Sequence, residues 1–89
     1  MKKIRIVHML CSNSFSGAEK VVCQIVNAFK NDENVEFVYT SPDGPIRDAL
    51  KDRDIDFEPM AAATIGEFKR VIHKVKPDIV HAHDMRAGF

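Results

Sequence analysis

Residues 4–30, IRIVHMLCSNSFSGAEKVVCQIVNAFK, decide the fold. The stretch begins as a β-rich apolar run, breaks into the small polar loop SNSFSG, and continues as an amphipathic helical pattern. Strand, glycine-bearing loop and helix in this order are typical of the opening of a nucleotide-binding α/β sheet. The first backbone N–H groups of a helix have no partner within the helix and lie at the positive end of its dipole. The opening therefore predicts a place that binds an anionic group.

The rest of the chain continues to alternate between strand and helix patterns. Strands are predicted near residues 4–10, 35–40, 55–58 and 78–82, with helices following Gly17, Pro45 and Thr64. This alternation favours a mostly parallel sheet with helices on both faces. Because crossovers are right-handed, the expected strand order is 3-2-1-4. We therefore predict an α/β fold that is half of a Rossmann-like doubly wound sheet.

Helical periodicity also predicts which side chains lie against the sheet. The spacing of apolar residues defines one stripe on the first helix and another on the third. The expected inward residues are Ala18, Val21, Val22, Ile25, Val26 and Phe29 in the first helix, and Ile65, Phe68, Val71, Ile72 and Val75 in the third.

Composition narrows the classes of function. The 89 residues include 13 basic and 13 acidic ones, so the balanced charge provides no global field that attracts nucleic acid or anionic lipid. No apolar run approaches the roughly 20 residues of a membrane span. The basic start MKKIRIVHML contains Arg5 and His8 and is interpreted as a strand, not a signal peptide. Cys11 and Cys23 do not form a disulfide framework, and reduced thiols predict a cytoplasmic protein.

Four segments together resemble the N-terminal domain of family four glycosyltransferases of the GT-B fold. They are IRIVHML, the SGAEK loop with its helix, DGPIRDALKD and PDIVHAHDMRAG. The resemblance implies a retaining enzyme that transfers a sugar from a nucleotide-sugar to a glycan or lipid-linked saccharide acceptor, in surface polysaccharide biosynthesis. It implies no metal and no cofactor beyond the nucleotide-sugar co-substrate. We expect residues 1–89 to be part of the acceptor-side domain, without the donor domain and inactive alone.

The loop before the first helix supplies the first candidate substrate-binding residues. Gly17, Ala18 and Glu19 match the end of the family's Gly-Gly-x-Glu turn, which borders the donor diphosphate and the acceptor; Ser16 replaces the first glycine. At Gly17 the missing Cβ would let a ligand approach the backbone. A structural role competes at the other two positions, because Ser16 and Glu19 have the S-x-x-E spacing of a capping box. Thr64 and Glu67 repeat that spacing where no functional role is expected.

The end of the fourth strand supplies the second group of candidates. His83 and Asp84 match the family's approach to the inter-domain cleft, and ligands of open α/β sheets bind beyond the carboxyl ends of strands where the strand order reverses. Arg86 could contact a phosphate, although a lone arginine is more often solvated. His81, one step back on the strand, is more often a packed core residue with His8 as its neighbour. Catalytic residues are not predicted.

Several alternatives accompany this interpretation. The D-x-D spellings at Asp52, Asp54 and Asp56, and the His81-x-His83 pair with Asp84, resemble metal sites, but solvated turns and chance spacing explain them, and no metal is expected. A non-catalytic half-Rossmann module for phosphate ligands or assembly is the main competing function, and a nucleotide-sugar epimerase is a weaker one. The expected location is the cytoplasm, with peripheral association at the inner face of the membrane as an option. The fourth strand predicts self-association through an exposed sheet edge.

Overall fold

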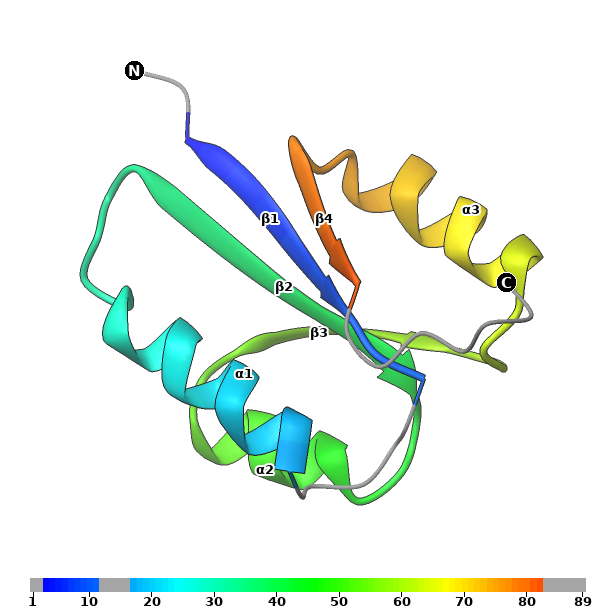
Figure 1. Ribbon diagram of the computed structural model, residues 1–89, viewed down its shortest axis with the longest axis horizontal. Coiled ribbons are helices and arrows are strands. Elements are labelled where there is room, and N and C mark those ends of the chain that lie inside the picture. Colours follow the sequence, from blue (N-terminus) through cyan, green and yellow to red (C-terminus); the bar gives the residue numbers. More distant parts are fainter. Residues whose placement is uncertain (1–2, 12–16, 83–89) are drawn as a thin grey trace.

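The structure, a computed structural model, describes residues 3–11 and 17–82 and consists of a sheet between two layers of helices (Figure 1). Short apolar strands alternate with amphipathic helices, as the sequence pattern predicts. In chain order the elements are β1 (Ile4–Met9), α1 (Gly17–Ala28), β2 (Val35–Pro42), α2 (Ile46–Asp52), β3 (Asp56–Met60), α3 (Ile65–Val75) and β4 (Ile79–Ala82).

All described strand pairs of the sheet are parallel, in the order β3-β2-β1-β4. The register places Ile4 opposite Val35 and Met9 opposite Ala82, so β1 pairs with β2 on one side and with β4 on the other. Helices α1 and α2 cover one face and α3 covers the other (Figure 1). This arrangement confirms the predicted α/β class, the strand order and the coverage of both faces.

Two strands run further than the sequence pattern indicated. β2 continues through Ser41 to Pro42, and β3 continues through Pro59 to Met60. The sequence pattern predicts strand ends at residues 40 and 58, just before Ser41-Pro42 and Pro59. Pro59 is compatible with a strand here because β3 is at the edge of the sheet, where a residue without an N–H need not interrupt a ladder.

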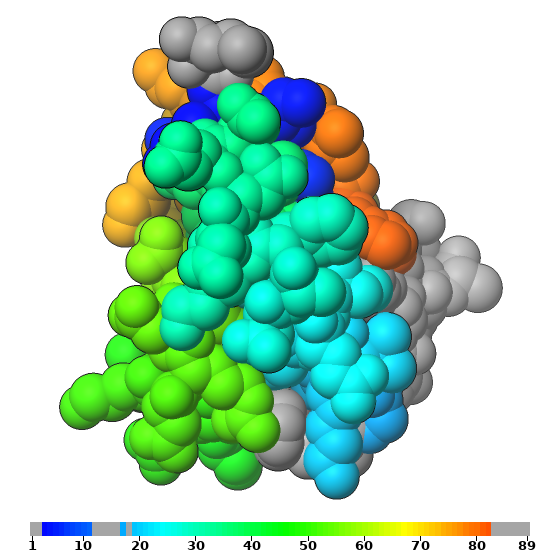
Figure 2. Space-filling view, turned by 90° about the vertical axis from the view of Figure 1, so that its left-hand side faces the viewer, coloured from blue at the N-terminus to red at the C-terminus, as the bar shows by residue number. Residues whose placement is uncertain are grey.

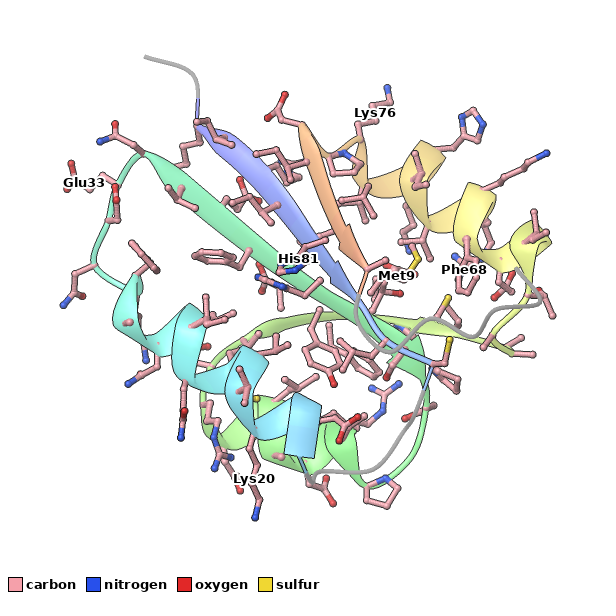
Figure 3. All side chains as sticks on the ribbon, viewed as in Figure 1. Met9, Lys20, Glu33, Phe68, Lys76 and His81 are labelled. Carbon is pink, nitrogen blue, oxygen red and sulfur yellow. The ribbon has the colours of Figure 1, made fainter. Side chains whose placement is uncertain are left out.

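Each face of the sheet has its own apolar core. Apolar burial is the main favourable contribution to folding, and in each layer it joins one face of the strands to the covering helices. The α3 layer contains Met9 and Phe68 (Figure 3) together with Val7, Val38, Met60, Val71 and Val75. The opposite layer contains Leu10, Val22, Cys23, Val26, Tyr39, Ile46 and Leu50.

The buried stripes of α1 and α3 are narrower than expected. Val21 in α1 is 52% exposed, and Ile65 and Ile72 in α3 are 57% and 39% exposed, so these three inward assignments were wrong. Phe29, which follows α1, is 48% exposed, but its ring centroid lies 6.2 Å from that of Phe37 on β2, so it does face the sheet. In α1, Cys23 is buried instead. The buried positions follow the line along which each helix touches the sheet, and apolar residues beside that line remain in solvent.

Candidate functional site

The carboxyl ends of β1 and β4 lie side by side at the point where the strand order reverses. Met9 pairs with Ala82, so both strands finish at the same level of the sheet. The chain passes directly from Ala82 into His83, and α1 begins at Gly17. Ligands of open α/β sheets bind in this position, outside the carboxyl ends of the strands. We call this edge, from Met9 to the first turn of α1 and to Ala82, the switch-point edge.

Gly17 is exposed and opens toward unfilled space. A Cβ built at Gly17 would meet no described atom within 4 Å, and its φ is not in the left-handed region. The described fold therefore does not require glycine here for backbone strain or for packing. No described residue fills the space that a side chain would occupy at this position.

Glu19 faces the interior, with only 3% of its surface exposed. It is the acidic residue of the first turn of α1, a position at which the helix dipole favours a negative charge. The buried side chains of Cys23 and Tyr39 belong to the same layer of the protein. Glu19 therefore lies in the first turn of α1 with its side chain turned into the protein.

The Tyr39 hydroxyl group is a buried polar atom in the core beneath α1 and α2, and the sequence pattern did not indicate it. The side chain is 1% exposed, and no described residue forms a hydrogen bond with its hydroxyl group. Burial raises the pKa of Tyr39, and the charges of Glu19 and Cys23 raise it further. Burial likewise raises the pKa of the Cys23 thiol, while the Arg53 guanidinium acts in the opposite direction. Both groups are held neutral at physiological pH.

Four of the predicted site residues lie outside the described residues: Ser16, His83, Asp84 and Arg86. Ala18 lies in the first turn of α1 between Gly17 and Glu19. The described part of the chain thus pairs the ends of β1 and β4, while residues 12–16, between β1 and α1, lie outside the described residues. It leaves the contribution of these four side chains as a prediction.

His8 and His81 are neighbours, as expected. Their ring centroids are 5.4 Å apart, and His8 also stacks on Phe37 with centroids 5.5 Å apart. His8 is 2% exposed, whereas His81 is exposed, so the expectation that His81 is a packed core residue was wrong (Figure 3). The reason is the position of β4, which pairs with β1 alone among the described strands.

The acidic residues before β3 lie away from the switch-point edge. Asp52 ends α2, Asp54 follows it with φ 56°, and Asp56 begins β3, so they lie toward the amino end of that strand. All three are exposed. Within residues 3–11 and 17–82, no three His, Cys, Asp or Glu side chains are grouped so that they could hold a metal ion.

Comparisons with known proteins identify no relative. No model of a protein family matches the sequence, and neither the curated proteins nor the solved structures include a match. Among the described helices, none is both long and apolar enough to cross a membrane.

Proposed function

We propose that this chain is part of the acceptor-side domain of a retaining glycosyltransferase. In this proposal it helps transfer a sugar from a nucleotide-sugar to a glycan or lipid-linked saccharide, in surface polysaccharide biosynthesis. The observation that carries the proposal is the pairing of the carboxyl ends of β1 and β4 at the point where the strand order reverses, with α1 following β1 along the chain and starting at the exposed Gly17. The sequence likeness of these same segments to family four glycosyltransferases supports it.

The proposed roles follow the chemistry of each group. The first N–H groups of α1, from Gly17 onward, face an anionic group of the substrate, and the helix dipole favours negative charge there. Ser16, Ala18 and Glu19 complete this turn, and His83, Asp84 and Arg86 contact the acceptor. Catalysis depends on holding donor and acceptor in one geometry, so we expect the chain to need a donor-holding domain for activity. The proposed reaction uses the nucleotide-sugar as co-substrate and needs no metal.

We place the protein in the cytoplasm, at or near the inner face of the membrane, because lipid-linked acceptors are presented there. We also propose that the chain associates with itself through the outer edge of β4, which pairs with no second strand among the described residues. Ile79 and Val80 on this strand are 50% and 42% exposed, and an unpaired strand edge is a template for another strand.

A non-catalytic module that binds a phosphate ligand is the second candidate. The same switch-point edge favours it, because the position of the crevice is a property of open α/β sheets and not of one reaction. The two candidates differ in what they require. A transferase must bind a nucleotide-sugar and an acceptor together, whereas a module needs one phosphate ligand.

Two glycines provide a matched test of the site. Gly17 begins α1 and Gly66 is the second residue of α3; both are exposed, and neither has a described atom within 4 Å of an added Cβ. We expect Gly17→Ala and Gly66→Ala to keep the wild-type fold. Uridine and guanosine diphosphate sugars are titrated into ¹⁵N-labelled protein, with amide chemical shifts as the readout.

The proposal predicts shifts at Gly17 to Glu19 and at the end of β1, and at least about tenfold weaker binding in Gly17→Ala, a change of about 1.4 kcal/mol. Gly66→Ala should bind as the wild type does. Absence of these shifts, or equal affinity in the two variants, would count against a ligand at the switch-point edge. Equal response to inorganic diphosphate and to the nucleotide-sugars would favour the phosphate-binding module.

A further inference from the structure

A hollow of about 500 Å³ lies between α1 and the end of α2, apart from the residues of the switch-point edge. It is lined by Lys20, Cys23, Gln24, Asn27 and Arg53. We call it the α1–α2 hollow. In Figure 2, α1, coloured cyan, lies beside the lime-coloured segment that follows α2. In Figure 3, Lys20 extends from α1 away from the sheet.

The lining from α1 is a regular stripe of hydrogen-bonding side chains. Residues 20, 23, 24 and 27 have the i, i+3, i+4, i+7 spacing that places side chains on one helix face. Gln24 and Asn27 each carry an amide with two N–H donors and one acceptor. Neither amide side chain makes a hydrogen bond with another described residue. The two amides therefore line the hollow without a hydrogen-bond partner among the described residues.

The charges around the hollow are positive. Lys20 lines it from α1 and Arg53 from the position after α2, and no carboxylate is among the described residues that line it. The Arg53 Nη1 atom donates to the Ala49 carbonyl oxygen at 2.9 Å, which fixes the guanidinium beside the end of α2. The Arg53 charge lowers the pKa of Cys23 by more than the Glu19 charge raises it, although burial keeps that pKa above its usual value. Among the described residues, the charged side chains that line the hollow are thus cationic, which favours an anion.

We propose that the α1–α2 hollow binds a small phosphorylated molecule that also carries hydroxyl groups. Guanidinium and ammonium groups hold phosphate oxygens through charge-assisted hydrogen bonds. The Gln24 and Asn27 amides, which both donate and accept, match hydroxyl groups. The volume lies within the range of small-molecule sites. This site goes beyond the proposed transferase function and does not depend on it.

Ribose 5-phosphate is the probe, with neutral ribose beside it, at constant ionic strength. Binding is measured by calorimetry and by amide shifts of ¹⁵N-labelled protein. We expect saturable binding of ribose 5-phosphate, with shifts at Gln24, Asn27 and Arg53 and at least tenfold weaker binding of ribose. Arg53→Met should weaken binding at least tenfold. Lys51→Met removes one positive charge from an exposed position of α2 outside the hollow and should change affinity less than twofold.

Gln24→Leu is the second variant, because Gln24 is exposed and its replacement removes donors without removing charge or core packing. It should weaken binding of ribose 5-phosphate about threefold or more. Equal losses in Arg53→Met and Lys51→Met would overturn the proposal, since they would indicate attraction to net charge alone. Shifts confined to Gly17 and its neighbours that disappear in Gly17→Ala would also overturn it by placing the phosphate at the switch-point edge. Absence of saturable binding would overturn it outright.

Discussion

At the scale of single residues, the hydroxyl group of Tyr39 is an unfavourable feature of the core. It is buried beside Glu19 and Cys23, and no described residue forms a hydrogen bond with it. A buried polar group without a partner loses its hydration and regains nothing. The ring itself packs well, with its centroid 6.2 Å from that of Phe57. Tyr39 therefore combines a favourable aromatic contact with an unfavourable polar atom.

Replacing Tyr39 with phenylalanine should leave the protein as stable as the wild type or more stable by up to about 1 kcal/mol. The substitution removes the hydroxyl group and keeps the ring. Urea unfolding monitored by circular dichroism gives the free energy of unfolding. Tyr39→Leu is the control, because it removes the ring as well and should be destabilising. A loss above about 1 kcal/mol in Tyr39→Phe would show that the hydroxyl group has a partner outside the described residues.

Alkaline pH should destabilise the wild type more than Tyr39→Phe. The folded pKa of Tyr39 is raised above the unfolded value near 10, so the unfolded chain releases this proton first. The stabilisation that comes from keeping Tyr39 protonated in the folded state is fully present below a pH of about 10. It is lost as the pH rises above this value, by at most about 1.4 kcal/mol per pH unit. Unfolding free energies of both proteins between pH 8 and 11 give the comparison. Parallel curves would contradict the raised pKa.

The sequence predicted the position of a side chain correctly where local spacing determines it. It failed to predict exposure that depends on contacts between elements far apart in the chain. His8 beside His81 followed from strand alternation and parallel pairing. The exposure of His81 did not, because it depends on whether another strand lies beyond β4. Likewise, Lys20, Gln24 and Asn27 show a polar stripe in the sequence, but Arg53 joins them only through the packing of α2 against α1.

At the scale of elements, hydrogen bonds and ion pairs hold the first turn of α3 in place. The Thr64 Oγ1 atom accepts a hydrogen bond from the Glu67 backbone N–H at 3.3 Å, which is one half of the expected capping box. The Glu67 carboxylate turns elsewhere. It accepts from the Ala61 backbone N–H at 2.7 Å and from Arg70, and Arg70 also contacts Glu58 on β3. The first turn is thereby tied both to its own cap and to the neighbouring strand.

Thr64→Ala should destabilise the protein by about 0.5 to 2 kcal/mol, because the first turn loses its side-chain acceptor. Thr64→Ser retains a hydroxyl group and should be close to the wild type. Urea unfolding of the two variants measures the difference. Equal stability of the alanine and serine variants would mean that the hydrogen bond at this cap contributes nothing.

The sequence predicted that each described strand and helix exists, but it did not predict the width of the buried faces of the helices. The spacing of apolar residues identified the described strands and helices, because the backbone sets a repeat of 2 residues in a strand and of 3.6 residues in a helix. The same periods overestimated the buried faces of α1 and α3. Val21 and Ile65 fit the apolar stripe, yet no described neighbour covers them enough to bury them. Strand ends at Pro42 and Pro59 were misplaced because a proline ends a strand only where its missing N–H interrupts a ladder.

At the scale of the whole molecule, the topology was predictable because chain alternation and right-handed crossovers leave few arrangements. The order β3-β2-β1-β4 then places a short apolar strand at one edge of the sheet. All four residues of β4 are exposed. Parallel sheets are normally covered on both faces, so this edge differs from the rest of the sheet.

Association through β4 should be weakened by Val80→Lys. The substitution places a charge on the edge strand, a device that opposes strand pairing. Ile65→Lys is the matched control, because Ile65 is similarly apolar and exposed but lies on α3. Sedimentation equilibrium over a range of concentrations should show dimers or larger species for the wild type and the control, and monomer for Val80→Lys. A wild type that remains monomeric at high concentration would contradict the proposed edge contact.

A transfer assay with the full product of the native reading frame tests the proposed glycosyltransferase activity. Radiolabelled nucleotide-sugars are supplied with lipid-linked saccharides extracted from membranes, and labelled lipid is counted. We predict transfer by the wild type and by Gly66→Ala, and at least about tenfold less transfer by Gly17→Ala at equal stability. Absence of transfer with any donor, or equal transfer by the two glycine variants, would contradict a transferase that binds its substrate at the switch-point edge.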